Sequence, residues 1–243
     1  MTVAPESPAS AGTADHSLRG LADQAGRSLE QASAEDVIRW AVRTFGPRLA
    51  VTSSMADAVI VDLVSRVGKE EGVRVDVLFL DTGYHFVETI GTRDAVEVIY
   101  PQVRVRTLLP LLTVAAQDQQ FGPRLHERDP DLCCAMRKVE PLKRALADYD
   151  AWITGLRRDE SPTRAATPVV GYDEGRGKVK INPIARWTQD DVDTYIAANG
   201  VLQNPLLMDG YSSIGCAPCT RRSESGREGR WAGLGKTECG IHL

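Results

Sequence analysis

Two hydrophobic periodicities alternate along the first two thirds of the chain. Segment 33–45 carries apolar residues at helical spacing, and Ser33 stands where it can cap the first turn. The helical pattern returns in 56–67 and 85–99. Short apolar runs around these segments are typical of buried strands, and they cover 48–54, 74–81, 102–109 and 150–156. Strands that alternate with helices predict an α/β fold, a doubly wound, mostly parallel sheet with helices on both faces.

A hairpin and one more helix follow this alternating region. Segment 167–184 has a glycine-rich turn between two short β-branched runs, which predicts the hairpin. Thr188 can cap a helix over 189–199, and Gly200 can end it.

The two ends of the chain differ from the pattern between them. Residues 1–32 are rich in Ala, Ser, Pro and Gly and predict a disordered lead-in. From Gly210 onward there are seven glycines and few apolar anchors, which predicts a mobile tail. We therefore expect a nucleotide-binding α/β domain over 33–210 and a flexible tail over 211–243.

The composition narrows the classes of function. A net charge of −4 gives no basic surplus for binding nucleic acid or an anionic membrane. The first residues lack the pattern of a secretory signal, and no apolar run approaches the roughly 18 residues of a membrane span. The expected location is cytoplasmic. In that reducing compartment the five cysteines, an odd number, are unsuited to a disulfide framework.

Polar residues stand where the predicted strands end, at the edge where open parallel sheets bind ligands. Each such group also has an ordinary interpretation, as a capping turn or a solvated charge run. Two such turns in successive strand–helix units favour a nucleotide pocket, and arginines after the fourth strand could grip anionic oxygens. The candidate residues are Ser53, Ser54, Asp81, Thr82, Gly83 and Arg157.

Four cysteines form two close pairs, Cys133 with Cys134 and Cys216 with Cys219. Two such pairs offer four thiolate ligands to one metal centre. Adjacent cysteines are unusual for zinc, because neighbours on a helix differ by about 100° in direction. A four-iron cluster, with iron atoms at separate corners, suits them better. The alternative is a buried cysteine pair and an unrelated turn.

Cations stand near these thiols in the sequence. On a helix, Lys138 would share a face with Cys134, and Arg137 with Cys133. Such cations would offset the negative charge of a thiolate-ligated cluster or bind an anionic substrate. The alternative is two solvated cations on an amphipathic helix.

The fifth cysteine, Cys239, lies in a basic, glycine-punctuated tail. Arg227, Arg230 and Lys236 precede it and His242 follows it. Cationic neighbours lower the pKa of a thiol and favour the nucleophilic thiolate. This combination favours a reactive thiol over an incidental one.

These motifs together resemble the assimilatory sulfonucleotide reductases, most closely the iron–sulfur type called adenylyl-sulfate (APS) reductase. The resemblance runs from roughly residue 35 to the C-terminus, with all motifs in the family's order. It rests on SSMADAV, LDTGYHFVET, CCAMRKVEPL, WITGLRRDESPTR, INPIARWTQDDV, GYSSIGCAPCTR, GREGRW and KTECGIHL.

The resemblance implies a fold like that of the adenine nucleotide alpha hydrolases and a thiol-based reaction. Cys239 would attack the sulfate sulfur of APS, expel AMP and become an S-sulfocysteine, from which external thioredoxin would release sulfite. It implies a 4Fe-4S cluster on Cys133, Cys134, Cys216 and Cys219. Lys138, Arg227, Arg230 and His242 would bind the phosphosulfate. Ser53, Ser54, Asp81, Thr82 and Gly83 would match the adenosine pocket.

Some features depart from related sequences and leave alternatives open. The SGGxDS phosphate loop of the fold's pyrophosphatases is replaced around Ser54, Met55, Asp57 and Ala58, which argues against ATP pyrophosphatase activity. The rivals are a PAPS reductase and a non-catalytic iron–sulfur or zinc redox-sensing module. The sequence also leaves open whether the chain forms a homo-oligomer.

Overall fold

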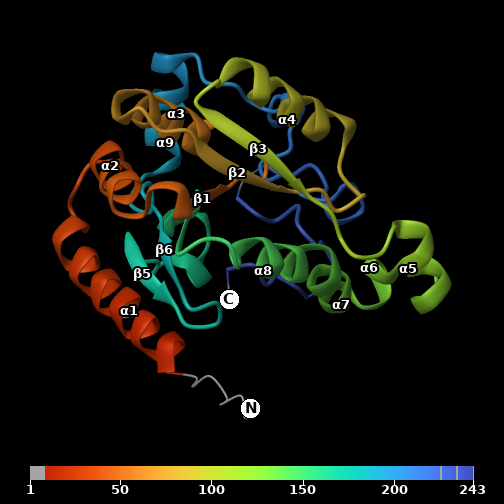
Figure 1. Ribbon diagram of the computed structural model, residues 1–243. Helices are drawn as coiled ribbons and strands as arrows, with labels where there is room; N and C mark the ends of the chain where they lie inside the picture. Colours follow the sequence, from red (N-terminus) through yellow and green to blue (C-terminus); the bar gives the residue numbers. More distant parts are fainter. Residues whose placement is uncertain (1–8, 225, 234, 243) are drawn as a thin grey trace, which may run out of the picture.

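The protein is described by a computed structural model over residues 9–224, 226–233 and 235–242, with side chains from residue 17 onward. Six strands form one sheet in the order β3-β2-β1-β4-β6-β5 (Figure 1). All neighbouring strands pair in parallel except β5 and β6, which form the predicted hairpin. The strands are β1 (Leu49–Thr52), β2 (Val75–Leu80), β3 (Val103–Leu108), β4 (Ala151–Ile153), β5 (Val170–Asp173) and β6 (Lys178–Ile181).

Helices cover both faces of this sheet, which confirms the predicted fold class. Val51 and Ile153 point to one face, into the core under the first helices, whereas Ala50 and Trp152 point to the other and pack with Leu142. The helices are α1 (Ala9–Leu29), α2 (Ala34–Phe45), α3 (Val59–Glu71), α4 (Val87–Ile99), α5 (Val114–Phe121), α6 (Leu125–Arg128), α7 (Pro130–Cys134), α8 (Glu140–Leu146) and α9 (Gln189–Asn199). Within the described ranges, none is long and apolar enough to cross a membrane.

The predicted helix caps are confirmed. Ser33 Oγ accepts a hydrogen bond from the Asp36 backbone N–H at the start of α2 (3.1 Å), and Thr188 Oγ1 accepts one from Asp191 at the start of α9 (3.2 Å). Gly200 ends α9 in the left-handed conformation, with φ of 62°. Local hydrogen bonding therefore fixes where these helices begin and end.

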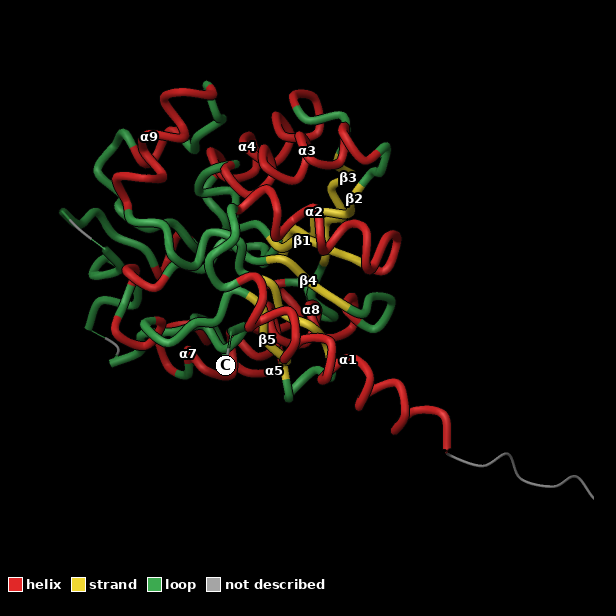
Figure 2. The backbone as a smooth tube through the Cα atoms, turned by 90° about the vertical axis from the view of Figure 1, so that its left-hand side faces the viewer, coloured by secondary structure: helices red, strands yellow, loops and turns green. Residues whose placement is uncertain are grey.

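The loops gather at one end of the strands. Figure 2 shows the strands near the centre of the molecule, with loop segments crowded on one side of them. The strand order reverses at β1. On one side of β1 lie β2 and β3, and on its other side lie β4, β6 and β5. Such a switch point opens a crevice at the carboxyl ends of the strands.

The expectation of a disordered lead-in over 1–32 is wrong for residues 9–29. They form α1, which packs along the β5–β6 hairpin (Figure 1). Ala22 and Ala25 are buried, and a Cβ on Gly26 would lie only 2.7 Å from the Val170 carbonyl oxygen. A composition rich in small residues suggests disorder, but here the small residues allow α1 to pack closely on the backbone of β5. Residues 1–8 lie outside the described part.

The two glycines of α1 give a matched test of this packing. Gly26→Ala would force the helix away from β5, and we expect the free energy of unfolding to fall by about 1–3 kcal/mol. Gly20→Ala has open space around the new methyl group, and it should be neutral or stabilise by about 0.5–1 kcal/mol because alanine favours helix. Thermal or urea unfolding of both variants measures the difference. Equal stabilities would contradict the observed docking of α1.

Candidate active site

A cavity of about 770 Å³ opens at the carboxyl ends of the strands. Residues from β1, β2, the segment after β4, the π-helical turn after α7 and the C-terminal segment line it, so that segments far apart in the sequence meet there. Eight of the residues predicted from the sequence share this cavity: Ser53, Ser54, Lys138, Arg157, Arg227, Arg230, Cys239 and His242.

The loop after β1 is shaped by its own hydrogen bonds. Ser53 Oγ accepts a hydrogen bond from the Met55 backbone N–H (3.2 Å), and Met55 takes a positive φ of 58° with its side chain fully buried. The Asp57 carboxylate accepts a hydrogen bond from the first residue of α3, Val59 (3.0 Å), and burial raises the pKa of Asp57. The start of α3 therefore already has a carboxylate from its own loop.

Asp81, Thr82 and Gly83 do not line the large cavity. Asp81 Oδ1 accepts a hydrogen bond from the Gly83 N–H (3.0 Å) and closes the turn after β2. Thr82 Oγ1 lies 3.2 Å from Cys216 Sγ, and the Tyr84 carbonyl accepts a hydrogen bond from Ala217 (2.7 Å). This turn therefore supports the cysteine segment.

The four paired cysteines line a second, smaller pocket. Cys133, Cys134 and Cys216 are buried, and Cys219 is partly exposed. Burial raises the pKa of Cys133 to about 12, and the charges of Cys134, Cys216 and Cys219 act in the same direction. Four thiols that oppose one another's ionisation at one place suit a cationic centre, which would stabilise all four thiolates.

The same pocket is not built for a single metal ion. Among the described residues, no three Cys, His, Asp or Glu side chains converge closely enough to hold one ion.

A π-helical turn, Ala135–Val139, follows directly after Cys134 and sets the directions of the two cations. Arg137 is buried and donates hydrogen bonds to the Thr82 carbonyl and to Gln117 Oε1 (2.9 Å), so it braces the turn after β2. Lys138 lines both the large cavity and the cysteine pocket. Burial lowers the pKa of Lys138, but the neighbouring thiols of Cys216, Cys239 and Cys134 act in the opposite direction, and the pKa is raised in total. Lys138 is therefore a fixed positive charge between the two pockets.

Cys239 is buried in the wall of the large cavity. It packs with Cys134 and Trp231, and Arg230 stacks over the Trp231 ring at 4.5 Å. Lys236 forms an ion pair with Asp131 in the first turn of α7. The C-terminal segment thus lies against the cysteine-bearing helix, and its sulfur reaches the cavity.

His242 lines the cavity, as the sequence predicts, but its surroundings disfavour the charged form of its ring. Its ring stacks on Trp152 with centroids 5.9 Å apart, and burial together with Lys180 and nearby arginines lowers its pKa well below the usual value. The Lys180 ammonium donates to the His242 carbonyl (3.3 Å), and burial lowers the pKa of Lys180 to about 8. The buried His242 ring therefore contributes packing against Trp152.

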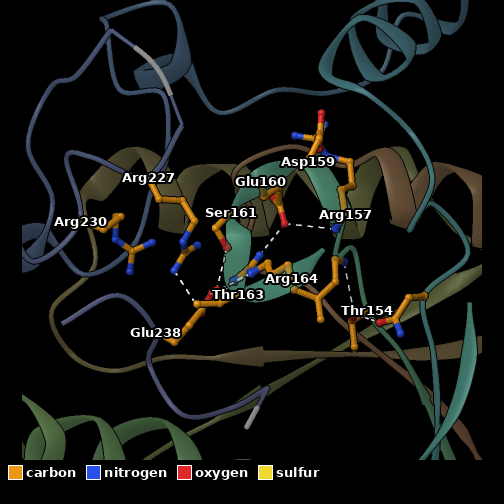
Figure 3. Close-up of polar contacts among 12 residues, drawn as sticks. Thr154, Arg157, Asp159, Glu160, Ser161, Thr163, Arg164, Arg227, Arg230 and Glu238 are labelled. Carbon is orange, nitrogen blue, oxygen red and sulfur yellow. Dashed lines mark hydrogen bonds and ion pairs between the residues drawn. The ribbon is translucent and has the colours of Figure 1, made fainter. Parts of the chain in front are cut away.

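Arg164 and Glu238 belong to the site, although the sequence interpretation assigns them no role. The Glu238 carboxylate accepts hydrogen bonds from Arg164 at 2.8 and 2.9 Å and from Arg227 at 3.3 Å (Figure 3). Burial alone would raise the pKa of Glu238, but the Arg164 guanidinium outweighs it and the pKa lies below its usual range. Arg157, on the same wall, donates to Gln189 (2.7 Å). Both Arg164 and Glu238 lie within quoted motifs, but only the fold places them together.

Comparison with known proteins agrees with this geometry. The model of the phosphoadenosine phosphosulfate reductase domain family matches residues 47–222. A protein named adenosine 5'-phosphosulfate reductase from Streptomyces coelicolor is 64% identical over 93% of this chain and 94% of its own length. One of the same name from Mycolicibacterium smegmatis is 53% identical over 94% of this chain and 96% of its own.

Solved structures agree with the fold. The crystal structure of phosphoadenylyl-sulfate (PAPS) reductase from Candida auris is similar, with a TM-score of 0.70 and 32% identity over 82% of this chain and 96% of that one. A Candida glabrata FMN adenylyltransferase, 11% identical with a TM-score of 0.56, covers 86% of this chain and 75% of its own and shares the fold alone. The chain therefore belongs to the phosphoadenosine phosphosulfate reductase family, enzymes that are oxidoreductases acting on sulfur groups.

Proposed function

We propose that the protein reduces adenosine 5'-phosphosulfate to sulfite and AMP, with Cys239 as nucleophile and a thioredoxin as external reductant. The observation that carries the proposal is a buried thiol, Cys239, in a cavity that Lys138, Arg227 and Arg230 also line. Two relatives named for this substrate, at 64% and 53% identity, support the choice of APS. The reaction places the protein in sulfate assimilation and cysteine biosynthesis, in the reducing cytoplasm.

The first chemical step is transfer of the sulfo group to the enzyme. The Cys239 thiolate attacks the sulfate sulfur, a sulfur–sulfur bond forms, and the bond from that sulfur to the bridging oxygen breaks. AMP leaves with the electron pair. Because thiolate and substrate are both anionic, fixed cations must lower the barrier, and Lys138 and Arg230 line the cavity for that purpose.

The second step releases sulfite. A reductant thiolate attacks the Cys239 sulfur of the S-sulfocysteine, forms a mixed disulfide and expels sulfite with the bonding pair. The second thiol of the reductant then frees Cys239. In total, two electrons pass from the dithiol to the sulfur.

We further propose that Cys133, Cys134, Cys216 and Cys219 hold a 4Fe-4S cluster. The support is that all four line one pocket, next to Lys138. A bound cluster would join α7 to the Cys216–Cys219 turn and contribute its charge to the local field. Thr82 and Arg137 would keep the two ligand segments in place.

A sulfite-release assay with APS and PAPS side by side tests the substrate and the nucleophile. The wild type, supplied with thioredoxin, should release sulfite from APS in preference to PAPS. Cys239→Ser should lower the rate by at least about a thousandfold, because a hydroxyl is a far weaker nucleophile than a thiolate. Preference for PAPS would reassign the substrate, and full activity of Cys239→Ser would refute the nucleophile. No sulfite from either nucleotide would favour a redox-sensing module.

Iron and acid-labile sulfide analysis tests the cluster. Cys219→Ser should lose iron and sulfide together and unfold at a lower temperature, since a tether between distant segments is lost. Cys239→Ser serves as the matched control and should keep both, along with the brown absorption of the cluster. Zinc in place of iron in the wild type, or full iron content in Cys219→Ser, would contradict the assignment.

A further inference from the structure

Glu238 directly precedes Cys239 and forms ion pairs with two arginines, Arg164 and Arg227. Its side chain is only 8% exposed. Arg164 donates from Nε to Oε1 and from Nη2 to Oε2, a bidentate contact, and Arg227 adds a bond to Oε2 (Figure 3). Charge-assisted, bidentate hydrogen bonds of this kind are among the strongest between side chains.

Arg164 lies in the segment that follows β4 and not in the C-terminal tail. It ends the short helical turn Pro162–Arg164 that follows β4, and its side chain is 9% exposed. A second carboxylate, Glu160, also pairs with it, and Glu160 Oε2 in turn accepts a hydrogen bond from the Arg157 backbone N–H (3.2 Å). The Glu238 contact therefore ties the tail to a part of the wall that is itself fixed.

The carboxylate also balances local charge. Arg164 and Arg227 both face Glu238, and burial together with the charge of Arg164 lowers the pKa of Arg227. Without a carboxylate between them, the two guanidiniums would repel each other in a half-buried place. Among the described residues, the tail also pairs Lys236 with Asp131, whose side chain is 82% exposed, and a pair with so exposed a partner contributes little.

We propose that Glu238 is the positioning residue of the catalytic tail: its grip on Arg164 and Arg227 holds Cys239 inside the cavity. Breaking the contact frees the tail and exposes the thiol to outside reagents, including the reductant. The inference rests on the proposed role of Cys239, but it concerns the place of the thiol and is tested without turnover.

The test is the rate at which iodoacetamide alkylates Cys239 in the full-length protein without nucleotide, read by peptide mapping. Glu238→Gln keeps the shape and removes the charge. We expect alkylation to become at least about tenfold faster, because charge-assisted bonds that favour the closed tail are weakened. Glu228→Gln is the matched control, since Glu228 is an exposed glutamate of the same segment, and its rate should equal that of the wild type.

The pH profile separates exposure from reactivity. Loss of a nearby negative charge would also shift the pKa of the thiol, which moves the midpoint of the rate–pH curve. Greater exposure instead raises the plateau rate at high pH, and that rise is the expected result. A plateau unchanged in Glu238→Gln would overturn the proposal.

A second variant covers the case in which Glu238→Gln folds poorly by circular dichroism. Arg164→Lys keeps the charge and loses the bidentate fork, so it should also raise the plateau rate, and an unchanged rate would overturn the proposal. If the plateau rate rises in Glu238→Gln but the wild type forms no sulfite from APS, the proposed function is refuted and the anchoring role of Glu238 stands.

Discussion

The site depends on the contact between the C-terminal segment and α7. Cys239 and Trp231 pack against Cys134, and this contact brings a thiol from the end of the chain to the carboxyl ends of β1 and β4. Without that contact the cavity would lack its nucleophile, since the other four cysteines line a separate pocket. The fold therefore provides the cavity, and the packing of the C-terminal segment places the Cys239 thiol in its wall.

Charge is distributed to suit this arrangement. Arg164 is paired with Glu160 and Glu238, and Arg227 is paired with Glu238. Lys138 instead lies between the thiols Cys216 and Cys239. Arg230 stacks over Trp231 and donates to the Ile214 carbonyl (3.1 Å), which keeps its charge in the cavity. Some cations thus hold the tail, and others are available to an anion. In a half-buried site this division matters, because an unpaired charge there is costly unless a ligand compensates it.

Much of this could be predicted from the sequence, where local patterns suffice. The helix caps at Ser33 and Thr188, the hairpin and the alternation of strands and helices are local signals, and the structure confirms them. That Cys239, Lys138 and Arg230 belong to one site could also be predicted, because each residue lies in a distinctive motif.

The rest required the fold. The composition of α1 resembles disorder, but its small residues are explained only by the backbone of β5 beside them. The charge of His242 depends on Trp152 and Lys180, which lie far from it in the sequence. Thr82 lies in the turn after β2, yet its side chain contacts Cys216 and not the cavity. In each case a long-range contact decides the role.

The account's central claim is that Cys239 becomes covalently sulfonated within the cavity. Mass spectrometry of the protein after incubation with APS, in the absence of any thiol reductant, tests it most directly. The account predicts a single sulfite adduct that maps to Cys239 and disappears on addition of reduced thioredoxin. An adduct on any other cysteine, or sulfite release with Cys239 unmodified throughout, would contradict it.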